Sequence, residues 1–151
     1  MKNANYTPLE EIIISGSKKG YFFLSEDKSK ITYRASGKSF GFKSEKERMR
    51  AYYLVELIEK YGFKEKEIQM DVETVMAGET KTIGLLVYRK RLPHIAVDFY
   101  ETNFKKAKDD LVKKALFLSA SFAVLISKNK KTILDLKNNC CVVNDFNNHK
   151  N

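Results

Sequence analysis

The sequence of 151 residues has no tryptophan, two prolines, two cysteines and two histidines. Cys140 and Cys141 are chain neighbours, and adjacent cysteines rarely form a disulfide with each other. No CxxC motif or histidine cluster accompanies them, so we expect free thiols in a reducing compartment. No charged-then-apolar leader opens the chain, and no apolar run approaches the roughly 18 residues of a membrane span. These absences predict a cytoplasmic protein without a membrane partner.

Charge is the most informative feature of the composition. The chain has 28 basic and 19 acidic side chains, a formal net charge of +9. Such an excess favours polyanionic partners such as DNA. The alternative is that a lysine-rich surface serves only solubility, and charge alone does not decide between them. The oligomeric state is left open.

The first part of the chain, residues 1–43, reads as a β-hairpin lead-in packed on a core. Short β-branched or aromatic runs at 12–15, 21–24 and 31–33 alternate with turn-rich segments, which predicts strands. A helix is expected from residue 44, because Ser44 followed by Glu47 fits the capping-box pattern. Gly62 supplies the left-handed residue that ends many helices.

The segment 44–137 is expected to form the core, followed by a frayed polar tail at 138–151. After the helix, residues 68–72 alternate with period two, as in a strand with one solvated face. Two denser apolar strands lie within 82–101, an amphipathic helix covers 104–120, and strands follow at 122–127 and 132–136. A strand–helix–strand crossover predicts an α/β fold, a mixed central β-sheet flanked by helices.

Within TIGLLVYRKRLPHIAVDFYE (82–101), a glycine and a carboxylate interrupt the apolar strands. Asp98 and Tyr100 are two residues apart on one strand and therefore project to the same face, while Gly84 belongs to the preceding strand. This stretch, with ITYRASGKSFGF (31–42), SEKERMRAYYLVELIEKYGF (44–63) and EIQMDVETV (67–75), resembles the N-terminal nuclease-like domain of type I restriction enzymes. That family belongs to the PD-(D/E)XK nuclease superfamily, and the resemblance runs from about Lys19 to Leu136.

The resemblance implies a restriction-endonuclease-like fold and a metal-dependent DNA-cleaving ancestor. In that family an Asp on one strand and an acidic residue on the next hold Mg²⁺, a hard cation that prefers oxygen ligands. A lysine two residues on assists the attacking water, and a helix Glu completes the cluster. On this pattern Glu47 and Asp98 are remnants, Asp98 being a weak metal ligand at most. Gly84 and Tyr100 occupy the lost Asp and Lys positions.

Each of these residues also has a structural interpretation. Glu47 can complete the capping box, Asp98 can pair with a neighbouring lysine, Gly84 can mark a bulge, and Tyr100 can be a strand-edge aromatic. Lys114, which falls near a family glutamine position, can supply a migrated ammonium.

Basic side chains around the two central strands and the second helix are candidates for contacts with DNA phosphates, because Lys and Arg dominate non-specific affinity. They are Arg89, Lys90, Arg91, Lys105, Lys106, Lys113 and Lys114. The alternative is a solvated helix face. The function expected from the sequence is a catalytically degenerate restriction-endonuclease-like domain that binds nucleic acid and needs no cofactor. The alternatives are an active Mg²⁺-dependent endonuclease, or a module that binds other subunits of a restriction or defence system.

Overall fold

A computed structural model describes residues 8–128 and 130–146. The chain divides into two compact units, Met1–Lys66 and Glu67–Asn151. We expected the helix at residue 44 to open the core that contains the larger sheet. It groups instead with the preceding segments, so the division falls after Lys66 and not after residue 43.

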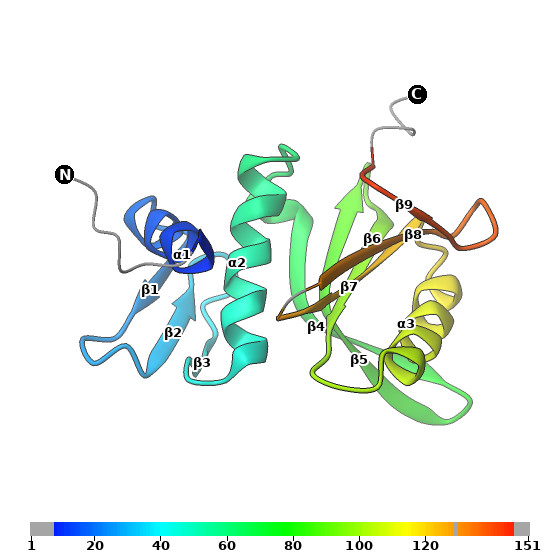
Figure 1. The fold of residues 1–151 in the computed structure, drawn as a ribbon, viewed down its shortest axis with the longest axis horizontal. Coiled ribbons are helices and arrows are strands. Elements are labelled where there is room, and N and C mark those ends of the chain that lie inside the picture. Colours follow the sequence, from blue (N-terminus) through cyan, green and yellow to red (C-terminus); the bar gives the residue numbers. More distant parts are fainter. Residues whose placement is uncertain (1–7, 129, 147–151) are drawn as a thin grey trace. The chain divides into compact units, whose positions relative to one another are not determined.

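The first unit combines two helices with a small sheet (Figure 1). Its elements are α1 (Pro8–Lys18), β1 (Phe22–Leu24), β2 (Lys30–Tyr33), β3 (Ser39–Gly41) and α2 (Glu45–Glu59). The strands form an antiparallel meander in the order β1-β2-β3. The short 3-10 helix η1 (Glu65–Glu67) lies at the division between the units.

Helix α1 occupies the segment in which we expected a strand at 12–15, so that prediction was wrong. Three consecutive isoleucines favour a strand locally. However, Pro8 stands at the first helical position, and two glutamates in the first turn and Lys18 in the last complement the helix dipole. Gly16 is buried in α1 and lets the helix approach closely: a Cβ there would lie 2.5 Å from Val55 Cγ2 of α2.

Helix α2 begins where the sequence predicted. The Ser44 hydroxyl accepts a hydrogen bond from the Glu47 backbone N–H at 3.2 Å. Gly62 has a φ of +78°, and the Phe63 N–H bonds to the Leu57 carbonyl, which closes the C-terminal end of the helix. The expected cap residues therefore define both ends of this helix.

The second unit is built on a six-stranded sheet in the order β4-β5-β6-β7-β8-β9 (Figure 1). The strands are β4 (Ile68–Met76), β5 (Glu79–Arg89), β6 (Leu92–Phe99), β7 (Phe122–Ser127), β8 (Lys130–Asp135) and β9 (Cys141–Val143). Among the strands of the described residues, only the β6–β7 pair is parallel, and helix α3 (Phe104–Phe117) connects these two strands. The predicted α/β fold with a mixed sheet and flanking helix is confirmed.

Helix α3 packs on one face of this sheet. Its buried residues Leu111 and Ala115 join a cluster with Leu86, Ala96 and Leu125 from three neighbouring strands. Central strand β7 is buried along nearly its whole length, which explains its continuous apolar sequence. The helix thereby lies over β7 and over β6, the strand that contains Asp98.

The tail is more ordered than the sequence predicted. Residues 141–143 form β9, which pairs antiparallel with β8. Phe146 is buried and contacts Phe122 edge-on, with ring centroids 5.0 Å apart. The expectation of a frayed tail was therefore wrong for residues 138–146, and residues 147–151 lie outside the described part of the chain. Within the described residues, no helix is both long and apolar enough to cross a membrane.

Candidate functional site

Gly84 and Asp98 lie side by side on neighbouring strands. The β5–β6 ladder pairs Leu85 with Val97, and the next position along brings Gly84 to Asp98. The Asp98 Oδ1 atom accepts a hydrogen bond from the Gly84 N–H at 3.0 Å. One oxygen of the carboxylate is therefore used to hold the two strands together.

Lys114 of α3 occupies the other oxygen of this carboxylate. Its Nζ atom lies 2.7 Å from Asp98 Oδ2 and 2.7 Å from the Thr82 carbonyl oxygen. The Lys114 side chain is 13% exposed and that of Asp98 is 24% exposed. A mostly buried ion pair thus joins α3 to β5 and β6, and Lys114 is a partner of Asp98 and not a surface cation.

The position of Gly84 is explained by this contact. A Cβ at residue 84 would lie 3.2 Å from Asp98 Oδ1 and 3.2 Å from Phe99 Cε2. Both distances are tight, so the two neighbouring side chains would have to shift by a few tenths of an ångström to admit a side chain, including the aspartate that the resemblance places there. The missing Cβ leaves room for the Asp98 carboxylate beside the β5 backbone.

Tyr100 stands just beyond the last residue of β6. Its N–H donates to the Ile126 carbonyl at 3.0 Å, continuing the pairing with β7. Its ring is partly buried against the α3 core and lies 5.6 Å from the Phe104 ring, centroid to centroid. These contacts give the ring a packing role at the sheet edge.

Glu47 belongs to the first unit, where it forms its own buried network. Its carboxylate accepts a hydrogen bond from the Tyr33 hydroxyl at 2.6 Å and two from the Arg50 guanidinium, both at 3.0 Å. Arg50 also lies over the Phe40 ring at 4.5 Å. Burial, reinforced by the Glu47 charge, raises the pKa of Tyr33 far above its ordinary value. The carboxylate therefore holds an internal cation and does not complete the capping box.

These side chains do not fit a magnesium site. Mg²⁺ requires carboxylate oxygens free to coordinate it, but Asp98 gives one oxygen to Gly84 N–H and the other to Lys114. Glu47 is held by Arg50, and Tyr100 offers a phenol. In the described part of the chain, no group of three or more His, Cys, Asp or Glu residues could hold a metal ion.

The basic residues expected to bind DNA fall into separate places. Arg89, Lys90 and Arg91 lie at the tight turn between β5 and β6, where Lys90 and Arg91 have positive φ values of 53° and 68°. These three residues precede β6, whereas Lys105 and Lys106 come after the end of β6, in the first helical turn of α3. The two groups therefore lie at opposite ends of β6 and form no single patch.

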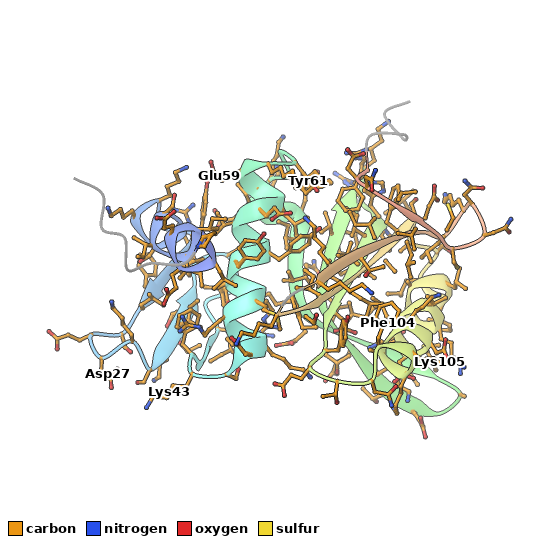
Figure 2. All side chains as sticks on the ribbon, in the orientation of Figure 1. Asp27, Lys43, Glu59, Tyr61, Phe104 and Lys105 are labelled. Atoms are coloured by element: carbon orange, nitrogen blue, oxygen red, sulfur yellow. The ribbon has the colours of Figure 1, made fainter. Side chains whose placement is uncertain are left out.

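Along α3 the expected cations also differ in environment. Lys106 pairs with Asp110 at 3.1 Å and Lys114 with Asp98, whereas Lys105 and Lys113 are exposed and, among the described residues, have no acidic partner. Figure 2 shows Phe104 and Lys105 at the start of this helix.

The sequence reasoning missed Lys130, whose ammonium lies 4.6 Å from the centroid of the Phe104 ring. Lys130 falls between the strands expected at 122–127 and 132–136, where we predicted no candidate residue. The available signal was topological: a turn that follows a strand parallel to β6 must lie at the end of the sheet where α3 begins.

Comparison with known proteins adds no relative. No protein-family model matches the chain, and no curated protein matches it either. The resemblance to the type I restriction enzyme domain stays a prediction.

Proposed function

We propose that this chain is a catalytically inactive, restriction-endonuclease-like domain that binds nucleic acid. The observation that carries the loss of catalysis is the ion pair between Asp98 and Lys114, at the place where the resemblance puts the metal. An ammonium at 2.7 Å from the carboxylate neutralises the charge that would attract a divalent cation.

Three further observations support the loss of catalysis. Gly84 contributes no side-chain ligand, and its backbone N–H donates a hydrogen bond to Asp98. The phenol of Tyr100 stands at the position of the family lysine, where its ring packs against the α3 core. Glu47 neutralises Arg50 within the first unit. Each remnant of the expected site therefore has a structural role.

Nucleic-acid binding is supported by the distribution of the +9 charge. Counted from the sequence, Met1–Lys66 has 14 basic and 9 acidic residues, and Glu67–Asn151 has 14 and 10. Both units are therefore basic, by +5 and +4. A cationic surface attracts a polyphosphate at long range and releases its counterions on contact.

Binding is tested by titrating labelled duplex and single-stranded DNA at about 50 mM and about 200 mM salt, the range over which phosphate contacts have large effects. We expect measurable affinity at the lower salt and a loss of at least tenfold at the higher. Absence of binding at the lower salt would refute the proposal.

Catalysis is tested by incubating plasmid DNA with the purified chain and Mg²⁺ or Mn²⁺. We expect no nicking. Nicking that is abolished both by a chelator and by Asp98→Asn would overturn the proposed loss of catalysis. Nicking that the substitution does not change would come from a contaminating nuclease and would leave the proposal intact.

The cellular location belongs to the same proposal. Cys140 and Cys141 are both free thiols, and Cys141 is exposed. Exposed thiols persist in reducing compartments, and we therefore place the domain in the cytoplasm.

A further inference from the structure

Helix α3 has two flanks that differ in charge balance. On the flank nearer β5, the residues spaced by four positions are Lys106, Asp110 and Lys114. Lys106 pairs with Asp110 at 3.1 Å, and Lys114 pairs with Asp98 at 2.7 Å. The cations of this flank are neutralised within the protein and have little remaining attraction for an external anion.

The opposite flank carries lysines without such partners. Lys108 follows Phe104 by four positions and Lys105 by three, so it neighbours both and lies between them around the helix. Lys130 reaches the same place from β8, with its ammonium 4.6 Å from the Phe104 ring. Among the described residues, none of these three lysines forms an ion pair. We name Lys105, Lys108 and Lys130 the Phe104 lysine cluster.

The topology explains why these lysines converge. Strands β6 and β7 are parallel, so their carboxyl ends lie at the same edge of the sheet. Helix α3 starts after β6, and the turn to β8 starts after β7. The first turn of α3 and the first residue of β8 are therefore brought together, although they are 26 positions apart between Phe104 and Lys130.

The start of α3 adds a second favourable contribution for anions. Asn103 caps the helix by accepting a hydrogen bond from the Lys106 N–H at 3.2 Å, and the first turn contains no acidic residue. The partial positive charge of a helix N-terminus thus adds to the charge of the lysines.

We propose that the Phe104 lysine cluster is the main contact with the phosphate backbone of duplex DNA. This inference rests on the proposed function and assigns its site. A duplex is favoured over a single strand because single-strand sites use accessible aromatic faces for base stacking. Here Phe104 is already contacted by the Lys130 ammonium and by the Tyr100 ring. A duplex also has a higher charge density than a single strand, about one phosphate charge per 1.7 Å of helix axis. It therefore attracts a cluster of three cations more strongly.

Nearby charges limit the strength of this contact. Glu101 and Asp109 are exposed close to the start of α3, and Lys128 and Lys131 are exposed in and beside the β7–β8 turn. The two acidic residues and the two lysines cancel in net charge. The net positive charge of the region therefore comes from the cluster itself.

The test compares two charge-matched triple variants of the whole chain. In the first, Lys105, Lys108 and Lys130 are each replaced by glutamine. The control replaces Lys38, Lys43 and Lys46, three exposed lysines of the first unit. Affinity for a labelled duplex and for a single strand of the same sequence is measured between about 50 mM and about 200 mM salt. Far-UV circular dichroism and urea midpoints verify that both variants fold.

Each duplex phosphate contact contributes about 0.9 to the slope of log K against log salt. We expect the cluster variant to lower the slope by about 2 to 3 and the duplex affinity near 0.1 M salt by on the order of 10²-fold. The control variant should lose less than about tenfold in duplex affinity, because it weakens only the long-range electrostatic attraction of the positively charged protein. Replacing the same three cluster lysines by arginine should retain binding.

The outcomes separate this inference from the proposed function. Equal losses in the two glutamine variants, with the unmodified chain binding duplex, would overturn the cluster as the site and leave the function standing. Tighter binding of the single strand than of the duplex would overturn the choice of ligand. A failure of the unmodified chain to bind at low salt would refute both.

Discussion

The Asp98–Lys114 ion pair gives the sharpest prediction about stability. We expect that Asp98→Asn and Lys114→Met each destabilise the second unit, whereas the double substitution costs little more than either one. The asparagine side chain would keep an oxygen for the Gly84 N–H but would leave the Lys114 ammonium uncompensated. The methionine side chain would keep the apolar stem but would leave the Asp98 charge without its cation and the Thr82 carbonyl without this donor.

The expected size of the effect follows from the burial of the pair. Removing one partner of a fully buried pair costs about 3–5 kcal/mol, whereas exposed pairs contribute about 0–1 kcal/mol. The two side chains are 13% and 24% exposed, closer to the buried limit. We therefore expect each single substitution to cost about 2–3 kcal/mol. The double variant should cost about 3 kcal/mol, and the two single costs together about 4–6 kcal/mol, which gives a coupling free energy of about 1–3 kcal/mol in magnitude.

The assay is urea unfolding of the four proteins of this double-mutant cycle, followed by far-UV circular dichroism and by tyrosine fluorescence. The free energies are comparable where the two probes give coincident transitions and the slope with urea does not change. Thermal unfolding at neutral pH gives an independent ranking. Raising the salt concentration should reduce the coupling only slightly, because buried pairs are weakly screened.

Additive effects would refute this reasoning. If the sum of the two single costs matches the double within about 0.5 kcal/mol, then Asp98 and Lys114 do not interact in solution. Asp98 would then be available for another ligand, and the argument against a metal site would lose its main support. Gain of Mn²⁺ binding by Lys114→Met alone would agree with the proposal, because that substitution removes the competing cation.

Further predictions concern the first unit. Gly16→Ala should cost about 1–3 kcal/mol in urea unfolding because its Cβ has no room, whereas Gly41→Ala, with open space around it, should change stability by less than about 0.5 kcal/mol. Glu47→Gln should cost about 2–3 kcal/mol, since the Arg50 side chain is 7% exposed, and equal stability would show that the pair is unimportant. Because the pKa of Tyr33 is higher in the folded protein than in the unfolded chain, the protonated hydroxyl stabilises the fold. This contribution to the free energy of unfolding is complete below a pH of about 10 and declines as the pH rises further. The free energy of unfolding is measured above pH of about 10, with tyrosinate absorbance followed in parallel. We expect it to fall less steeply with pH in Tyr33→Phe than in the unmodified chain, and an equal slope would contradict this reasoning.

Parts of the fold could be predicted because their signals are local. The cap at Ser44 and the positive φ at Gly62 depend on residues within one turn of the helix ends. The strands at 122–127 and 132–136 followed from continuous apolar runs between turn residues. At 12–15 the local signals conflicted, and the proline and glutamates outweighed the strand preference of the isoleucines.

The candidate site could be located but not interpreted from the sequence. Gly84 and Asp98 were expected on neighbouring strands, and a hydrogen bond of 3.0 Å joins them. The sequence offered several partners for Asp98, and only the packing of α3 on the sheet selects Lys114. For Glu47 the capping box was the nearest alternative, but Arg50 and the distant Tyr33 take its carboxylate.

By itself the sequence determined the mixed α/β class, the basic character of the chain and the main helix and strand positions, since these depend on composition and short-range periodicity. Only the tertiary structure decided which charges are neutralised and which remain available. Contacts such as Lys114 with Asp98 and Lys130 with Phe104 join segments that are far apart in the chain. Their formation depends on strand order and helix packing, which no local pattern encodes.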